Sequence, residues 1–129
     1  MTTLLDLMHE PPLERRPGSP PFEIAEVEHL DLTSKDWGFE RKMASIQLGR
    51  TSCGKWVWAT SYSLATCGRY CGVWGNERKF ARSREAALHH AIEELRERLR
   101  DLQRNATSTW SRSNDRMIAD ILKWAEGLR

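Results

Sequence analysis

Cysteine and histidine are the residues of this sequence that could hold a metal ion. Cys67 and Cys71 are separated by three residues, Cys53 precedes them, and His89 and His90 follow. Three thiolates and one imidazole would make a tetrahedral zinc site. The C-x3-C spacing is not one of the established zinc pairings, and the ligands would have to converge from three separate elements. We therefore interpret the cysteines as buried or half-buried core side chains and predict neither a metal nor another cofactor.

Catalytic motifs give no stronger signal. Adjacent residues of a helix point about 100° apart, so His89 and His90 cannot both face one site. The sequence contains no G-x-S-x-G, no phosphate-binding glycine loop and no H-E-x-x-H. We expect a protein that is not an enzyme, and a metal- or thiol-dependent enzyme is the third-ranked alternative.

Aromatic residues are the unusual feature of the composition, which includes six tryptophans. If residues 55–64 form a strand, alternate side chains share one face. The members of that face are Trp56, Trp58, Thr60, Tyr62 and Leu64. We expect helices to bury this face and to leave the opposite face of the sheet open.

Charge is distributed unevenly along the chain, although the formal net charge is only +2. Residues 1–31 hold seven acidic residues against Arg15 and Arg16, whereas residues 32–84 hold ten basic residues against three acidic ones. A basic region that also carries aromatic residues can attract and anchor a partner. The residues expected to make this contact are Trp37, Arg41, Lys42, Arg50, Arg69, Tyr70, Arg78 and Lys79.

The length of 129 residues predicts one domain. Residues 1–21 are expected to form an N-terminal arm, with a short helix at Thr3–Glu10 and a proline-rich linker, and residues 22–129 a single α+β domain. No run of the sequence is long and apolar enough to span a bilayer, and no export signal is recognisable. With an odd number of cysteines, this favours a cytoplasmic protein without membrane partners.

Strands are expected at Phe22–Leu32 and Phe39–Gly49, then at 55–64, with a third extended run at Arg69–Trp74. Ser83 is a good N-cap for a long helix whose apolar stripe runs to Leu102. A second capping cluster at Ser113, Asn114 and Asp115 predicts a shorter C-terminal helix. The fold class is therefore α+β, with an antiparallel sheet of three to four strands and both helices packed on one face.

The start of the long helix resembles the last helix of the double-stranded RNA-binding domain. The matching residues are Ser83, Arg84, Ala87, Ala91 and Leu95. Glu85 and Ala86 stand where that family places further lysines. The resemblance implies the topology of that domain. Direct nucleic-acid binding through the basic, aromatic sheet face is the second-ranked function, because aromatic surfaces ringed by positive charge can stack bases.

The segments Phe80–Ala87 and Ile121–Leu128 also resemble parts of small accessory modules of plasmids and phages, in which a tryptophan-rich hairpin precedes the helix. This resemblance implies a mobile-element protein in a bacterial host cell. Our leading expectation is non-catalytic inhibition or modulation of a host nucleic-acid-handling defence complex, in the manner of anti-CRISPR proteins. The partner would be a host protein or ribonucleoprotein, and an exposed arginine row on the long helix could also rim a homodimer.

Overall fold

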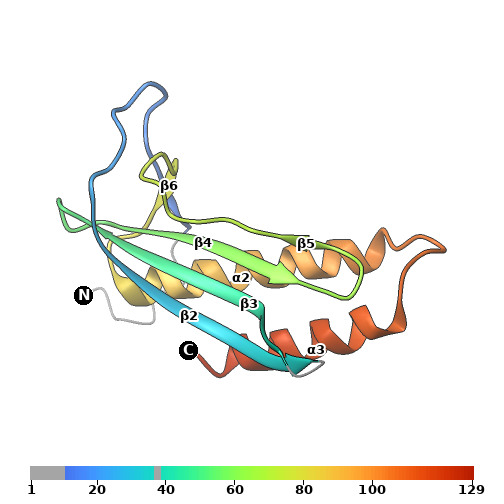
Figure 1. Cartoon of the computed structure of the whole chain (residues 1–129). Coiled ribbons are helices and arrows are strands. Elements are labelled where there is room, and N and C mark those ends of the chain that lie inside the picture. The colour runs from blue at the N-terminus through green and yellow to red at the C-terminus, as the bar shows by residue number, and fades with distance from the viewer. Residues whose placement is uncertain (1–10, 37–38) are drawn as a thin grey trace.

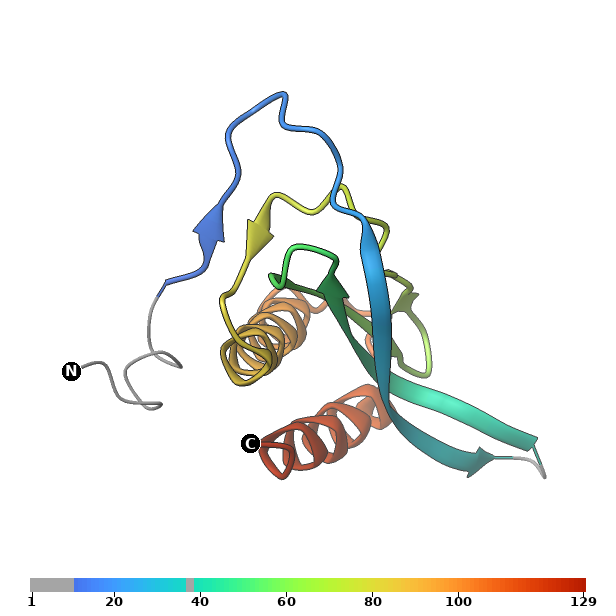
Figure 2. The same cartoon turned by 90° about the vertical axis from the view of Figure 1, so that its left-hand side faces the viewer.

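A computed structural model describes residues 11–36 and 39–129 of the chain. Its main sheet has four antiparallel strands in the order β2-β3-β4-β5: Ile24–Asp36, Phe39–Thr51, Trp56–Ser63 and Gly68–Arg69. A second sheet pairs β1 (Leu13–Glu14) with β6 (Lys79–Phe80), and the helices are α2 (Arg84–Arg104) and α3 (Arg112–Glu126). Figures 1 and 2 show both helices on the same side of the main sheet. The predicted α+β fold class is confirmed.

The long β2–β3 hairpin and β4 form the body of the sheet. In the register, Ile46 of β3 lies between Leu30 of β2 and Thr60 of β4, so these side chains share the face toward the helices. The pairing of β2 with β3 continues to Asp36, beyond the predicted end of the first strand at Leu32. A register shift between Leu32 and Thr33 interrupts the alternation there.

The face toward the helices carries the hydrophobic core. Ile46, Leu48 and Leu95 are each 0% exposed, and the predicted stripe of the long helix is buried as far as Leu99. The alternating aromatic face of β4 lies on this side as predicted, with Thr60 and Leu64 buried and Trp56, Trp58 and Tyr62 partly buried against the core. Each fully buried Leu or Ile side chain contributes roughly 1.5–3 kcal/mol to folding.

Helix caps explain where the two helices begin. The Ser83 side chain accepts a hydrogen bond from Ala86 N at 3.1 Å, which confirms the predicted N-cap of α2. The N-cap of α3 is Ser111, two residues before the predicted cluster. Asn114 of that cluster has another role. Its Oδ1 accepts from the backbone N of Ala65 and Thr66, at 2.9 and 3.3 Å, and thereby anchors the β4–β5 turn.

The expected third extended run is strand only at Gly68–Arg69, and the prediction of a strand through Trp74 is wrong. Residues 70–74, here named the outer strip, leave the edge of the sheet and cross the face opposite the helices. The Cys71 backbone N donates to Ser61 Oγ at 2.9 Å, and Val73 N donates to Gln47 Oε1 at 3.2 Å. The Ser61 and Gln47 side chains thus provide hydrogen bonds in place of the backbone partners that a strand would have had.

The proline-rich segment is attached to the rest of the domain. Leu13 pairs with Phe80 in the small sheet, and Arg15 Nε donates to the Glu77 carbonyl oxygen at 2.9 Å. The Arg15 guanidinium also lies 4.3 Å from the centroid of the Phe22 ring. Residues 11–21, expected to be a linker, therefore pack against β6 and the turn before it. The predicted helix at Thr3–Glu10 lies outside the described residues.

Candidate binding surface

The outer strip covers the centre of the sheet face that lies away from the helices. Under it, Val57 is 0% exposed and Gln47 only 9% exposed. The Gly49 Cα faces Val73 so closely that an added Cβ would lie 3.2 Å from Val73 Cγ2. The expectation that this face is open is therefore wrong for its centre. The strip itself, and the end of the sheet next to it, form the accessible surface.

Two large aromatic side chains of the outer strip are exposed. Tyr70 keeps 75% of its surface accessible and Trp74 keeps 73%. The backbone next to Tyr70 is held by the hydrogen bond from Cys71 N to Ser61 Oγ, and the backbone at Trp74 is held because Glu77 accepts from Trp74 N at 2.7 Å and Gly75 N at 2.8 Å. The indole also packs on Gly72, where an added Cβ would lie 3.2 Å from Trp74 Cζ2. The strip therefore presents two aromatic groups from an ordered backbone.

A cavity of about 320 Å³ lies beside Tyr70, at the end of the sheet where β5 begins. Its wall is mainly apolar, and Lys42 and Arg69 contribute positive charge. The Arg69 Nη2 donates to Cys71 Sγ at 3.4 Å, and this hydrogen bond raises the pKa of Arg69, so the group stays cationic. Three residues predicted from the sequence, Lys42, Arg69 and Tyr70, are therefore brought together.

The other predicted contact residues are placed differently. Arg41 Nη2 donates to the carbonyl oxygens of Ser63 and Leu64, at 2.9 and 2.8 Å, and so closes the end of β4. Arg50 pairs with Trp56 at the opposite end of the sheet, and Arg78 and Lys79 lie at β6 near that same end. Trp37 lies outside the described residues. The predicted contact set includes Trp37 and does not include the exposed Trp74.

The charge separation seen along the sequence is cancelled where the elements meet. Three acidic residues of β2 pair with basic residues of the following region: Glu26 with Arg50 at 3.2 Å, Glu28 with Arg84 at 2.7 Å, and Asp31 with Lys42 at 3.4 Å. The expected spatial segregation of charge is therefore wrong for these pairs. The acidic strand lies directly beside the basic one because the hairpin joins them.

The prediction of buried or half-buried cysteines is wrong for Cys53 and Cys67 and agrees with the structure for Cys71. Cys53 and Cys67 are exposed and Cys71 is half-buried, all three as free thiols. A hydrogen bond with Thr51 Oγ1, at 3.2 Å, is the main reason why the pKa of Cys53 is lowered. No group of three or more Cys, His, Asp or Glu side chains within residues 11–36 and 39–129 is arranged to hold a metal ion.

The two histidines have different neighbours. His90 lies against Trp58 of β4, with ring centroids 5.4 Å apart. Burial, and then the nearby charges of His89 and Lys79, lower the pKa of His90. His89 Nδ1 lies 2.8 Å from Arg129 Nη1. Because His90 packs on a core tryptophan, we interpret it as a structural residue.

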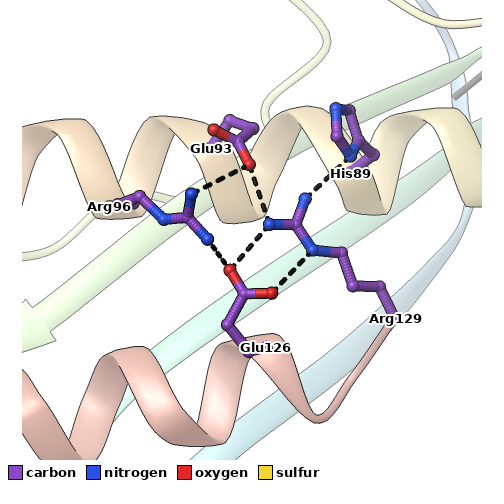
Figure 3. Close-up of polar contacts among 5 residues, drawn as sticks. All are labelled: His89, Glu93, Arg96, Glu126 and Arg129. Atoms are coloured by element: carbon purple, nitrogen blue, oxygen red, sulfur yellow. Dashed lines mark hydrogen bonds and ion pairs between the residues drawn. The ribbon is translucent and has the colours of Figure 1, made fainter. Parts of the chain in front are cut away.

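Charged side chains from α2 and from the end of α3 meet in one cluster (Figure 3). Arg129 Nη2 donates to Glu93 at 2.8 Å and to Glu126 at 2.6 Å, and Arg96 contacts the same two carboxylates. Burial would raise the pKa of Glu93, but the hydrogen bond from Arg129 and the charge of Arg96 lower it overall. Two guanidinium groups and two carboxylates neutralise one another, so we interpret the cluster as a set of ion pairs that holds α2 and the end of α3 together.

Comparison of the chain with protein-family models, with curated proteins and with solved structures finds no match. Neither described helix is long and apolar enough to cross a membrane.

Proposed function

We propose that this chain is a non-catalytic binding protein that contacts a protein partner through the outer strip and the cavity beside Tyr70. The observation that carries the proposal is the exposure of Tyr70 and Trp74 on a backbone that is already fixed. Large aromatic side chains are expensive to leave in water and dominate the energetics of protein interfaces. An ordered backbone also reduces the entropy that is lost on binding.

The arrangement of cations favours a protein over a nucleic acid as the partner. Affinity for nucleic acid depends on the neutralisation of several phosphates in a row. Here Arg41 donates to backbone carbonyls, Arg50 pairs with Glu26, and Lys42 has Asp31 at 3.4 Å. The phosphate backbone of a nucleic acid bound on the outer strip would lie close to the Asp31 carboxylate beside the cavity and be repelled by it. A protein with an apolar contact and a few acidic side chains suits the surface better.

The biological setting is proposed from the resemblance to plasmid and phage modules. In that setting the partner is a host protein or ribonucleoprotein of a nucleic-acid-handling defence complex, and binding inhibits or modulates it, as anti-CRISPR proteins do. Such inhibition requires binding energy and no chemical step. An inhibitor of this kind therefore needs an exposed contact surface, and the exposed Tyr70 and Trp74 side chains of the outer strip provide one.

Site-specific photo-cross-linking tests the contact surface. A benzophenone amino acid placed at Tyr70 or Trp74 in bacterial cells should give a discrete adduct with a protein. The same group at Arg100, exposed on α2, is the control and should give none. Equal adducts from all three positions, or no adduct from the outer strip, would contradict the proposal.

The inhibitory role is tested with a phage-sensitivity assay in bacteria with an active CRISPR system. Expression of the chain should restore plaque formation, and the double substitution Tyr70→Ser and Trp74→Ser should abolish this. Arg100→Ser should behave like the unsubstituted chain. If the double variant remains fully active, the outer strip is not the inhibitory surface.

Direct nucleic-acid binding is the second candidate function, because Lys42 and Arg69 line a cavity beside an exposed Tyr70 that could stack on a base. It predicts a gel shift whose affinity falls steeply as salt rises. The Lys42→Glu and Arg69→Glu double variant should then lose the shift. A complete absence of a shift at low salt would dismiss this candidate.

A further inference from the structure

A second cavity lies at the far end of α2, and Tyr62 lines both this cavity and the cavity beside Tyr70. Its volume is about 670 Å³, within the range of small-molecule sites. It is an open cavity lined by the last turns of α2, the loop between α2 and α3, the turn between β4 and β5, and Tyr62 of β4. We name it the helix-end cavity and argue its ligand from six of its lining residues: Tyr62, Thr66, Arg98, Asp101, Leu102 and Trp110.

Apolar and aromatic groups form one part of the wall. Tyr62, Leu102 and Trp110 are each partly buried against the core and line the cavity. Trp110 is fixed in place, because its Nε1 donates to Asp115 Oδ1 at 3.0 Å. A wall of this composition suits a flat, apolar ring better than a sugar or a flexible polar chain.

Arg98 supplies a guanidinium donor. Its Nη2 donates to Glu94 Oε1 at 2.9 Å, whereas its Nε is buried and has no acceptor within the described part of the chain. Because the Nε atom has almost no accessible surface, a ligand in the cavity would contact the outer nitrogens of the guanidinium and not Nε. About a third of the Arg98 side chain remains exposed, at 34%, so the guanidinium borders the cavity.

Thr66 supplies a second donor on the same cavity. Its Oγ1 accepts from Asn114 Nδ2 at 2.6 Å, so its own hydroxyl hydrogen points to a different acceptor. Asn114 is fully buried and also holds the Thr66 backbone, which fixes the hydroxyl relative to α3. Both Arg98 and Thr66 line the cavity, and each can donate to a carboxylate oxygen.

The local charge limits the ligand to a monoanion. Asp101 lines the cavity and pairs with Arg104 at 2.7 Å, while Glu94 already neutralises part of the charge on Arg98. A phosphate with two negative charges would meet these carboxylates, whereas a carboxylate brings one charge that Arg98 can compensate. We propose that the helix-end cavity binds a small aromatic carboxylate, with its ring against Tyr62, Leu102 and Trp110 and its carboxylate on Arg98 and Thr66.

Nuclear magnetic resonance with a matched pair of probes tests this site. The full chain is titrated with 2-naphthoate and with 2-naphthamide, which has the same ring and no charge. We expect 2-naphthoate to bind with a Kd of about 1 mM, as its size implies, and to shift the Nε–H resonance of Arg98. Equal binding of the two probes, or no shift of this resonance at saturation, would overturn the proposal.

Two variants distinguish recognition from mere folding. Arg98→Met should weaken 2-naphthoate by about tenfold or more and leave 2-naphthamide unchanged. Leu102→Trp keeps Arg98 but fills the cavity, so it should exclude both probes. Each variant is first shown to unfold cooperatively. Should 2-naphthoate bind the folded Leu102→Trp variant as it binds the unsubstituted chain, it lies elsewhere and the proposal is wrong.

Discussion

Arg84 at the start of α2 donates two hydrogen bonds, each 2.7 Å long, to the two carboxylate oxygens of Glu28 in β2. This pair joins the first turn of the long helix to the edge strand. The hydrogen bonds from Arg84 lower the pKa of Glu28, burial opposes this slightly, and the positive charge of Arg84 adds to it. The pair is therefore a source of stability that depends on pH.

Glu28→Gln should lower the free energy of unfolding by about 0.5–1 kcal/mol at neutral pH, because both side chains are more than a third exposed and solvent screens them. The lowered pKa means that this stability is present above the ordinary value of 4.5 and is lost as the pH falls through the folded-state pKa. Urea unfolding should therefore show the stabilities of the variant and the unsubstituted chain converging as the pH falls below 4.5 and through the folded-state pKa of Glu28. Glu26→Gln, in the more exposed pair with Arg50, is the control and should lower the free energy of unfolding by a smaller amount.

Asn114→Ala should lower the free energy of unfolding much more, by about 2–4 kcal/mol, because it removes a fully buried side chain that accepts from two backbone N–H groups of the β4–β5 turn and donates to Thr66 Oγ1. Chemical denaturation measures the loss. Ser113→Ala, at the exposed neighbouring position, should change stability by less than about 0.5 kcal/mol. A similar, small effect of both substitutions would show that Asn114 does not hold the turn.

Gly75→Ala should destabilise the chain more than Gly54→Ala. Both glycines have positive φ, +93° and +82°, so both substitutions introduce backbone strain. Only at Gly75 would the new Cβ also collide with backbone, 2.3 Å from the Phe22 carbonyl oxygen. Thermal unfolding of the two variants distinguishes backbone strain alone from strain combined with a steric clash. An equal decrease in melting temperature for both variants would contradict the close packing of Phe22 on this turn.

His90 should titrate below its ordinary value of 6.5, as histidine resonances can show directly. Burial against Trp58 and the charges of His89 and Lys79 favour the neutral ring, and Glu93 opposes them. Because the folded-state pKa is the lower one, stability is complete above about pH 6.5 and falls as the pH drops toward the folded-state value.

The variant His90→Gln should remove this decline below about pH 6.5. His29→Gln, at an exposed position of β2, is the matched control for the loss of a histidine. If His29→Gln abolished the decline and His90→Gln did not, the pH dependence would belong to another site.

Periodicity was sufficient to predict the parts of the fold that depend on local side-chain alternation. The stripe from Leu88 to Leu99 and the aromatic face of β4 are buried as expected, because a helix or strand with one apolar side has few other ways to exclude water. The N-cap at Ser83 was equally predictable, since its hydrogen bond is local.

Contacts between distant segments were not predictable in this way. Residues 70–74 have the composition of a strand, but Ser61 and Gln47 offer hydrogen bonds on the face of the sheet, and the chain takes these instead of an edge. The pairing of Arg41 with the end of β4 likewise depends on where the β3–β4 register places it. Of the predicted contact residues, Lys42, Arg69 and Tyr70 therefore lie at the candidate contact surface. The basic residues Arg50, Arg78 and Lys79 lie at the opposite end of the sheet.

The pairing of β2 with basic partners also bears on how the chain begins to fold. In the unfolded chain, the acidic block up to Asp31 and the basic block after it attract each other before any register is set. This attraction brings the two arms of the hairpin together, and dissolved ions weaken it. The early collapse of this protein should therefore be faster in dilute buffer than in concentrated salt.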